Sequence, residues 1–590
     1  MKKYFNPTLL LLLAFPLISL SGCKGQNNNP SDFDPDEGQN EIPDQSENYD
    51  SISSAVAALK DSLTDDQKNT ALPSSYESSV YAITAAGDYY FSGALSGAIS
   101  VSKNAGNVHI YLDNVTLSVE NDSLISSKKG ANVTITLIGT NTLSNSGDSA
   151  KHVIDSKENL VINGSGTLTI NSTKSAISCD KTFIGLGGTL NVTAIKHGVT
   201  GDSIYLNGTM INAINVGKDV LHAESDYDEV EVAPEFNYGA GFVFVENGGL
   251  NLTLAYGDAI QADSYVYIKG GTFNLTTTPT WNNNYVATEN REKGMFDRNT
   301  HQKVARDSVR KGSTYAVLEE SVKGIKVGEI DYYLASDLTN ELTVESENYT
   351  CLIEGGTFNI NCVDDAIHVN SGSALIYGGN LTINTSDDGI HADDNLKISG
   401  QAVIDIQSSY EGIEAETMDI SGGDITVNAL DDGLNATNSL LSESAQKEIC
   451  QINISGGRLD VTVNPNGDRD GIDSNGGIKI SGGTIIARGP NSSMACAIDA
   501  SNTITISDGI VIVLGYAPGS SSGRGGPGGG GMGEGTLSLA ADIIKTQSSS
   551  KGLSLGEHSV VVNGVSIEYE NLYTYQGNTT VFAKYNATIN

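Results

Sequence analysis

Two heptapeptides near the middle of the chain, DDAIHVN (364–370) and DDGIHAD (387–393), repeat one pattern of paired Asp, a small residue, Ile and His. The central apolar residues of these two copies and of the later ones are Ile367, Ile390, Ile413, Leu434, Ile472 and Ile498. The first three steps along this series are 23, 23 and 21 residues. Weaker copies upstream centre on Ile154, Ile177, Val199, Leu221, Ile260 and Ile325. A repeat of about 22 residues therefore runs through most of the chain.

A second pattern lies between these phrases, as in IEGGTFNI (353–360) and ISGGDITV (420–427). Each stretch reads as an apolar strand, a glycine turn and an alternating strand. Three short strands in about 22 residues are too few for a propeller blade and fit one coil of a right-handed parallel β-helix. The sequence therefore predicts an all-β solenoid, with inward Ile, Leu and Val in columns and outward residues in ladders about 4.8 Å apart.

Composition agrees with this fold class. The 590 residues include 66 Gly, only 6% aromatic residues and 38% hydrophobic residues, which favours an elongated fold with a narrow core over a large helical protein. The chain carries 34 Lys and Arg against 71 Asp and Glu, a net charge of −37, which excludes a general electrostatic nucleic-acid binder. Five Cys follow Cys23, and their spacings match no zinc or redox motif.

The N-terminus reads as an export signal, with Lys2 and Lys3 before an apolar run that ends in the lipobox-like LSGC (20–23). We expect lipid on Cys23 and an exported protein anchored to a bacterial membrane at the cell surface; the alternative is an ordinary signal peptide cleaved near a chance Cys. The predicted organisation is a signal over 1–23, a tether over 24–50, an N-terminal cap over 51–75, a β-helix over 76–535 with an inserted loop at 281–313 and a glycine-rich loop at 519–535, and a C-terminal β cap over 536–590.

Aligning the coils on their central apolar residue places acidic side chains in register. Carboxylates about 4.8 Å apart repel by roughly 3 kcal/mol per pair at an effective dielectric of 20, so a compensating cation is expected. Ca²⁺ suits such oxygen ligands. The predicted calcium ligands are Asp364, Asp365, Asp387, Asp388, Glu411, Asp431 and Asp432. The alternative is that these acids only form solvated turns at the coil corners. Zinc is disfavoured, because the alignment shows one stacked His pair and no accompanying Cys.

Other side chains in these rows are candidates for ligand contact. His368 and His391 either pair with neighbouring carboxylates or contact sugar. Tyr410, and Trp281 in the inserted loop, are either stacking platforms or ordinary surface residues. The predicted substrate-binding residues are His368, His391, Tyr410, Glu414 and Lys326. Lys323 and Lys326 either neutralise the acids or, in an enzyme, provide a Brønsted base or a contact for a uronate carboxylate.

The chain resembles bacterial surface lipoproteins that contain a carbohydrate-binding right-handed β-helix. The matching stretches are KGIKVG (323–328), DDAIHVN, DDGIHAD, DDGLNAT (431–437) and the repeated ISGG, within about residues 80 to 535. These proteins bind cellulose and acidic sugars and are similar in fold to calcium-dependent pectate lyases. The resemblance implies calcium on the acidic ladder and a polysaccharide lying along the solenoid.

Three functions remain open from the sequence. The favoured one is a monomeric surface lipoprotein that binds an acidic, pectin-like or cellulosic polysaccharide without cleaving it. The first alternative is a calcium-dependent pectate or uronate lyase, in which Lys323 or Lys326 would be the base. The second is a structural or adhesive surface rod that needs no ligand.

Overall fold

The computed structural model describes residues 80–148, 151–224, 241–279, 321–328, 349–438, 441–464, 469–490 and 495–515, together with strand segments between 281 and 318 and between 536 and 589. The chain divides into two compact units. The first, Met1–Ala71 with Asp226–Gly239, lies outside the described residues. The expected signal, tether, N-terminal cap, lipidation site Cys23 and glycine-rich loop also lie outside them.

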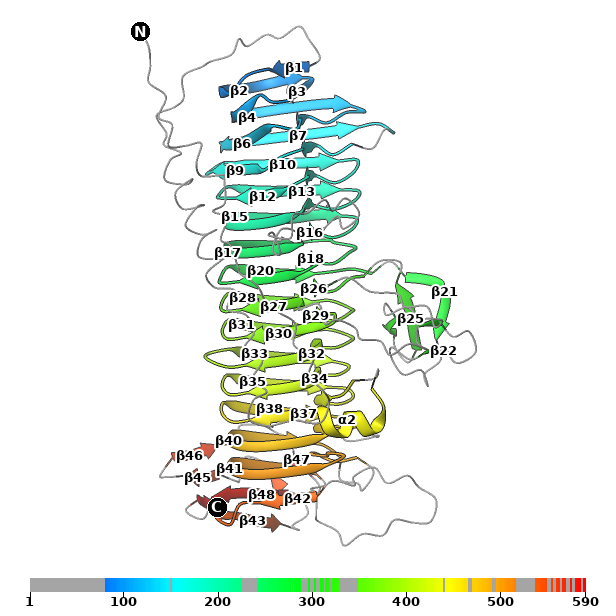
Figure 1. The fold of residues 1–590 in the computed structure, drawn as a ribbon, viewed down its shortest axis with the longest axis vertical. Coiled ribbons are helices and arrows are strands. Elements are labelled where there is room, and N and C mark those ends of the chain that lie inside the picture. The colour runs from blue at the N-terminus through cyan, green and yellow to red at the C-terminus, as the bar shows by residue number, and fades with distance from the viewer. Residues whose placement is uncertain are drawn as a thin grey trace, which may run out of the picture. The chain divides into compact units, whose positions relative to one another are not determined.

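The second unit is a parallel β-solenoid of about 13 turns, which confirms the predicted fold class (Figure 1). Each turn contributes strands to three parallel ladders. The first ladder carries the DDGIH-type phrases. It runs through β1 Val80–Ile83, β3 Ala98–Val101, β5 Ile125–Ser127, β8 Ile154–Ser156, β11 Ile177–Cys179, β14 Val199–Gly201, β16 Leu221–Ala223, β18 Ile260–Ala262, β26 Ile325–Val327, β29 Ile367–Val369, β32 Ile390–Ile398, β34 Ile413–Ile420, β36 Leu434–Ala436 and β39 Ile472–Ser474.

The second ladder follows from the apolar strands before the glycine turns. It consists of β2 Gly87–Ser96, β4 Gly106–Glu120, β6 Ala131–Ile138, β9 Leu160–Gly164, β12 Thr182–Gly185, β15 Ser203–Val216, β17 Phe242–Leu252, β19 Tyr265–Ile268, β27 Tyr349–Ile353, β30 Gly372–Ile376, the later parts of β32 and β34, β37 Gln451–Ile454, β40 Gly477–Arg488, β41 Thr503–Leu514 and β42 Thr536–Leu539.

The third ladder follows from the alternating strands after those turns. Beside the later parts of the long strands β2, β4, β15, β17, β40 and β41, it contains β7 Thr140–Ser146, β10 Thr167–Ser172, β13 Thr189–Ala194, β20 Thr272–Thr276, β28 Thr357–Asn361, β31 Asn380–Asn384, β33 Val403–Ser409, β35 Asp424–Ala429 and β38 Arg458–Val463. The turn before β35 needs Gly423 at φ +87°, and the turn before β38 needs Gly457 at φ +77°. Side chains with a Cβ are strained in this left-handed region.

The register of the first ladder confirms the repeat alignment. Ile325 pairs with Ile367, Ile367 with Ile390, and Ile390 with Ile413. The same pairing links all twelve predicted central residues, from Ile154 to Ile498. Inward positions form one continuous apolar core, in which these central residues are at most 1% exposed. Outward positions are therefore also in register from coil to coil.

Several elements lie outside the three ladders. The interruption at 281–313, expected to be a loop, contains the antiparallel strands β21 Trp281–Ala287 and β24 Ser308–Lys311, joined through β25 Thr314–Leu318, and a second pair, β22 Phe296–Asp297 and β23 Gln302–Lys303. Residues 443–449 form the short helix α2 Glu443–Ile449. None of the helices in the described residues is long and apolar enough to cross a membrane.

The C-terminal residues add antiparallel strands. β48 Thr579–Lys584 pairs with β41 and with β43 Ile543–Ser548. The remaining strands are β44 Leu553–Ser554, β45 Ser559–Val562, β46 Val565–Glu568, β47 Thr574–Tyr575 and β49 Ala587–Ile589. The five described Cys residues are all buried and free of disulfides.

Candidate functional site

The polar residues at the start of the first-ladder strands form a continuous feature, which we call the acid–histidine column. Each coil contributes the residue two before its central apolar residue and the residue one after it. The column contains Asp219, His222, Asp258, Lys323, Lys326, Asp365, His368, Asp388, His391, Glu411, Glu414, Asp432, Asp470, Asp473 and Asp499. Several of its members are nearly inaccessible, including Asp258 and Asp388 at 1% exposure.

Backbone amides hold the carboxylates of this column in place. The N–H of Asp258 donates to Asp219 Oδ1 at 2.8 Å, and the N–H of Lys323 donates to Asp258 Oδ1 at 2.7 Å. The N–H of Asp388 donates to Asp365 Oδ1 at 2.9 Å. Toward the C-terminal end of the column, the Asp470 N–H donates to Asp432 Oδ1 at 2.7 Å, and the Cys496 N–H donates to Asp470. Each such bond joins one coil to the next, so part of the expected repulsion is offset by amide donors.

Histidines three residues after the aspartates engage the second carboxylate oxygen. The distance from His368 Nδ1 to Asp365 Oδ2 is 2.7 Å, and that from His391 Nδ1 to Asp388 Oδ2 is 3.1 Å. The two imidazole rings are 4.6 Å apart between centroids. The reading of these His residues as partners of neighbouring carboxylates therefore agrees with the structure, and His391 also lies 3.7 Å from Glu414.

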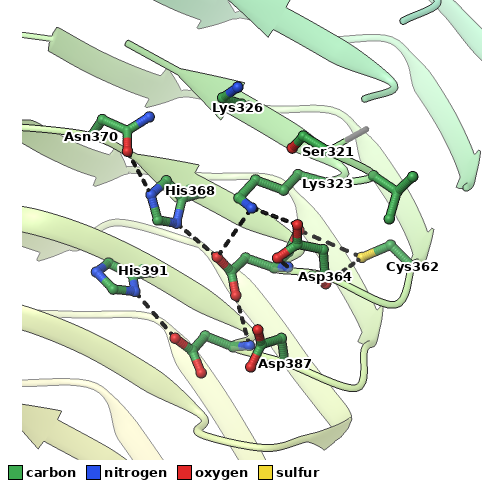
Figure 2. Close-up of polar contacts among 12 residues, drawn as sticks. Ser321, Lys323, Lys326, Cys362, Asp364, His368, Asn370, Asp387 and His391 are labelled. Carbon is green, nitrogen blue, oxygen red and sulfur yellow. Dashed lines mark hydrogen bonds and ion pairs between the residues drawn. The ribbon is translucent and has the colours of Figure 1, made fainter. Parts of the chain in front are cut away.

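Lys323 replaces an acid within the column (Figure 2). Its Nζ lies 2.6 Å from Asp364 Oδ2 and 3.8 Å from Asp365 Oδ2. The side chains of Lys323 and Asp364 are only 3% and 1% exposed. An ammonium group thus occupies the position between the first two acids that the sequence assigned to calcium. Lys326, in contrast, lies 3.9 Å from Asp258 Oδ2.

Asn370 determines which ring nitrogen of His368 donates a proton (Figure 2). The Asn370 amide nitrogen donates to the carbonyls of Gly328 and Val327, at 2.9 and 3.3 Å, so its Oδ1 faces His368 Nε2 at 2.9 Å. Nε2 must therefore donate to Asn370, while Nδ1 faces the carboxylate of Asp365. Burial lowers the pKa of His368, and the hydrogen bond to Asp365 opposes this shift.

The C-terminal end of the column, which we call the lower column, contains Asp432, Asp470, Asp473 and Asp499 and is more strongly acidic. Carboxylate oxygens of Asp470, Asp473 and Asp499 lie within 4.8 Å of one another. Burial and the neighbouring carboxylates of Asp432, Asp470 and Asp499 raise the pKa of Asp473 well above its usual value. Burial and the charges of Asp431, Asp470 and Glu414 raise the pKa of Asp432 to about 8, against the Asp470 N–H bond. Within the described residues, no Lys or Arg forms an ion pair with Asp473 or Asp499.

The remaining predicted residues occupy mixed environments. Asp387 and Asp364 are buried and group with Asp365, whereas Asp431 lies 3.3 Å from Arg469 Nε. Glu411 Oε2 accepts a hydrogen bond from Asn435 at 3.0 Å. Tyr410 precedes β34 and is half-buried. The side chain of Trp281 lies outside the described residues.

Sequence reasoning missed three features of the site. Asp258 accepts hydrogen bonds from Ser321 Oγ and from the Lys323 N–H, and burial raises its pKa to about 7. Asp473 and Asp499 follow the central residues Ile472 and Ile498 directly, but they were not among the predicted calcium ligands. The expectation of a single stacked His pair was wrong, because the rings of His197 and His222 are also 4.5 Å apart. His197 lies in one row and His222 in the other, so an alignment by rows separates them.

The fold and the site together define a parallel β-solenoid whose coils carry a column of stacked carboxylates and histidines. The chain belongs to the family of carbohydrate-binding domain-containing proteins, whose family model matches residues 77–389 and 379–589. No curated protein and no solved structure matches the chain. The family supports polysaccharide as the partner.

Proposed function

We propose that this protein binds an acidic polysaccharide along the acid–histidine column, with calcium as the bridging ion and without cleaving the chain. The observation that carries the proposal is the group formed by Asp470, Asp473 and Asp499, whose carboxylate oxygens lie within 4.8 Å of one another. Such a group attracts a hard cation, and a cation held there would in turn attract uronate carboxylates. The family match supports the polysaccharide part of the proposal.

The donor set decides where along the column calcium fits. Asp364 and Asp365 already face the ammonium of Lys323, so a second cation there would be repelled. Asp473 and Asp499 form no ion pair with Lys or Arg among the described residues, and the neighbouring Asp432 and Asp470 add oxygen donors. We therefore assign calcium to Asp432, Asp470, Asp473 and Asp499, of which Asp432 belongs to the set predicted from the sequence. Bound calcium would supply positive charge and open coordination positions for ligand oxygens.

Side chains higher in the column would contact the sugar chain. His391 and Glu414 are about one-fifth exposed and lie 3.7 Å apart, so together they offer a donor and an acceptor. Lys326 is 13% exposed and provides a positive charge for a uronate carboxylate. Tyr410 would provide an aromatic surface for a sugar ring.

The lyase alternative requires a neutral Lys as base. Lys323 is a poor candidate, because an ammonium held 2.6 Å from a buried carboxylate is stabilised in its charged form. Lys326 remains the candidate base if cleavage occurs. A purely structural role would not account for the three clustered carboxylates of Asp470, Asp473 and Asp499.

We also propose that the protein is exported and attached to a bacterial membrane through lipid on Cys23. The LSGC sequence at 20–23 supports this. Metabolic labelling with a fatty acid, and partitioning of the protein into a detergent phase, should both be lost in the Cys23→Ser variant. Labelling that persists in this variant would overturn the proposal.

Incubation of the purified protein with polygalacturonate, with calcium or with chelator, tests the function. We expect retention of the polymer only with calcium, and no rise in ultraviolet absorbance from unsaturated uronide. Rising absorbance would identify a lyase, with Lys326→Met as the next variant. Absence of retention with polygalacturonate and with cellulose would overturn the binding proposal and favour the structural rod.

A further inference from the structure

A second polar group lies in the column above Asp258, where the first ladder passes from β14 to β16. Asp219 Oδ2 is 3.2 Å from His197 Nδ1 and 2.7 Å from His222 Nδ1. One nitrogen of each imidazole therefore lies close to the same carboxylate oxygen. All three potential ligand atoms lie within 4.8 Å of one another.

The Asp219 carboxylate is held in a fixed orientation. Its Oδ1 accepts the backbone N–H of Asp258 at 2.8 Å, so Oδ2 is left facing the two histidines. On the far side of the His222 ring, Nε2 lies 3.6 Å from Glu224 Oε2. In many metal sites a carboxylate lies on this side of an imidazole and the other ring nitrogen binds the metal.

His197 provides an observation that an ordinary ion pair does not explain. Its Nδ1 is buried and lacks a hydrogen-bond partner of acceptable geometry, although it lies 3.2 Å from Asp219 Oδ2. The nitrogen is close to the oxygen but is not aligned to donate a proton to it. A metal ion between the two atoms does not require that alignment, because each ligand atom directs its lone pair at the ion.

The spacing also suits a small divalent ion. Zn²⁺ binds His nitrogen and carboxylate oxygen at about 2.0–2.2 Å, which places tetrahedral ligand atoms roughly 3.3–3.5 Å apart. The two nitrogen-to-oxygen distances of 3.2 and 2.7 Å need only small side-chain movements to reach this geometry. The side chains are 18%, 15% and 19% exposed, so an ion can reach them from solvent.

The geometry points to a binding site for a divalent transition-metal ion of the Zn²⁺ type, formed by His197, Asp219 and His222. Three protein ligands leave one coordination position for water or for an oxygen of a bound molecule. Each imidazole nitrogen that binds the ion must be free of its proton, so binding should weaken at acidic pH. This site is distinct from the proposed calcium group, since two of its three ligands are softer nitrogen donors.

The similar group of Asp365, His368 and His391 provides the comparison. There the Asp365 carboxylate lies 3.8 Å from Lys323 Nζ, whose charge opposes a second cation. Among the described residues, Asp219 forms no ion pair with Lys or Arg. We therefore expect the metal at His197 and His222, and not at His368 and His391.

Titration of the purified full chain with Co²⁺ tests the proposal. Tetrahedral Co²⁺ absorbs visible light, so we expect an absorption band that saturates at one equivalent, disappears on addition of Zn²⁺ and persists in excess Ca²⁺. His197→Gln and His222→Gln should each weaken Co²⁺ binding at least tenfold. His391→Gln is the matched control and should bind Co²⁺ like the unmodified protein.

Folding of each variant is checked by circular dichroism in chelator. Should either Gln variant unfold, Asp219→Asn keeps the oxygen that accepts from Asp258 and should also weaken binding. The proposal is overturned if the unmodified protein shows no saturable band, if the band survives in the folded His197 and His222 variants, or if it is lost in His391→Gln. In each of these cases, the cluster is an ion pair only.

Discussion

The Nζ of Lys323 lies 2.6 Å from Asp364 Oδ2, and the two side chains are 3% and 1% exposed. This buried ion pair lies in the middle of an acidic column, with Asp365 3.8 Å from the same ammonium. A buried charge without its partner destabilises the folded state. The stability of this coil, with its two buried carboxylates, therefore depends on the ammonium of Lys323.

Replacing that Lys tests this dependence. We expect Lys323→Met to lower the free energy of unfolding by roughly 3–5 kcal/mol, because two buried carboxylates lose their nearest ammonium. Chemical denaturation followed by circular dichroism measures the change. Lys479→Met, at an exposed position on β40, is the matched control, and its effect should be within about 0.5 kcal/mol. Equal effects of the two substitutions would show that the Asp364 contact contributes little.

Removal of carboxylates from the lower column tests the calcium assignment. We expect Asp473→Asn and Asp499→Asn to weaken calcium binding at least tenfold, because each removes a charged oxygen donor. The same substitutions should abolish the stabilisation of the protein by calcium in thermal unfolding. Asp419→Asn, at an exposed position on β34, should change neither quantity. Unchanged calcium affinity in both column variants, measured by calorimetry, would place the ion elsewhere.

Protonation of Asp394 should make the stability of the protein depend on pH. Burial, with the charges of Asp393 and Glu416, raises the pKa of Asp394 to about 6. The folded protein therefore binds this proton more tightly than the unfolded chain, and the stabilising contribution is lost as the pH rises from about 4 to about 6.

The corresponding variant is Asp394→Asn, which should raise the melting temperature by on the order of 1–2 °C above pH 6. The difference from the unmodified protein should shrink as the pH falls from 6 toward 4, because the carboxyl of the folded protein becomes protonated over this range. Melting curves between pH 4 and pH 8 measure this. A difference that is constant across this range would show that the charge of Asp394 is not responsible.

Removal of the aromatic side chain of Tyr410 tests the proposed sugar contact. We expect Tyr410→Ala to weaken retention of polygalacturonate roughly 2- to 10-fold, the loss of one aromatic contact. Tyr377→Ala is the control, because Tyr377 is 38% exposed but follows β30 and does not belong to the column. A larger loss in Tyr377→Ala than in Tyr410→Ala would move the binding surface to another face.

Much of the architecture could be read from the repeat. Ile367, Ile390 and Ile413 recur at nearly constant spacing, and each pairs with the next. Parallel strands in a solenoid pair residue by residue at a fixed separation, so a repeat in the sequence becomes a register in space. The strands within 281–318 could not be predicted in this way, because they interrupt the repeat and pair antiparallel among themselves.

The candidate site was predictable only in part. Alignment by rows identified Asp365, His368 and Asp388, but it separated His197 from His222, whose rings meet across two rows. Neutralisation of the acids by Lys323 was among the expectations, but Asp364 as its partner was not, because a long side chain reaches beyond its own row.

By itself, the sequence determined the coil, its three strands and the order in which the acids stack, because these follow from local apolar periodicity and glycine turns repeated along the chain. Only the tertiary structure decided which acids are neutralised. Asp364 faces Lys323, whereas Asp473 faces other carboxylates, and the difference depends on side-chain reach and on burial. Burial strengthens every charge interaction, and it is a property of the assembled coils.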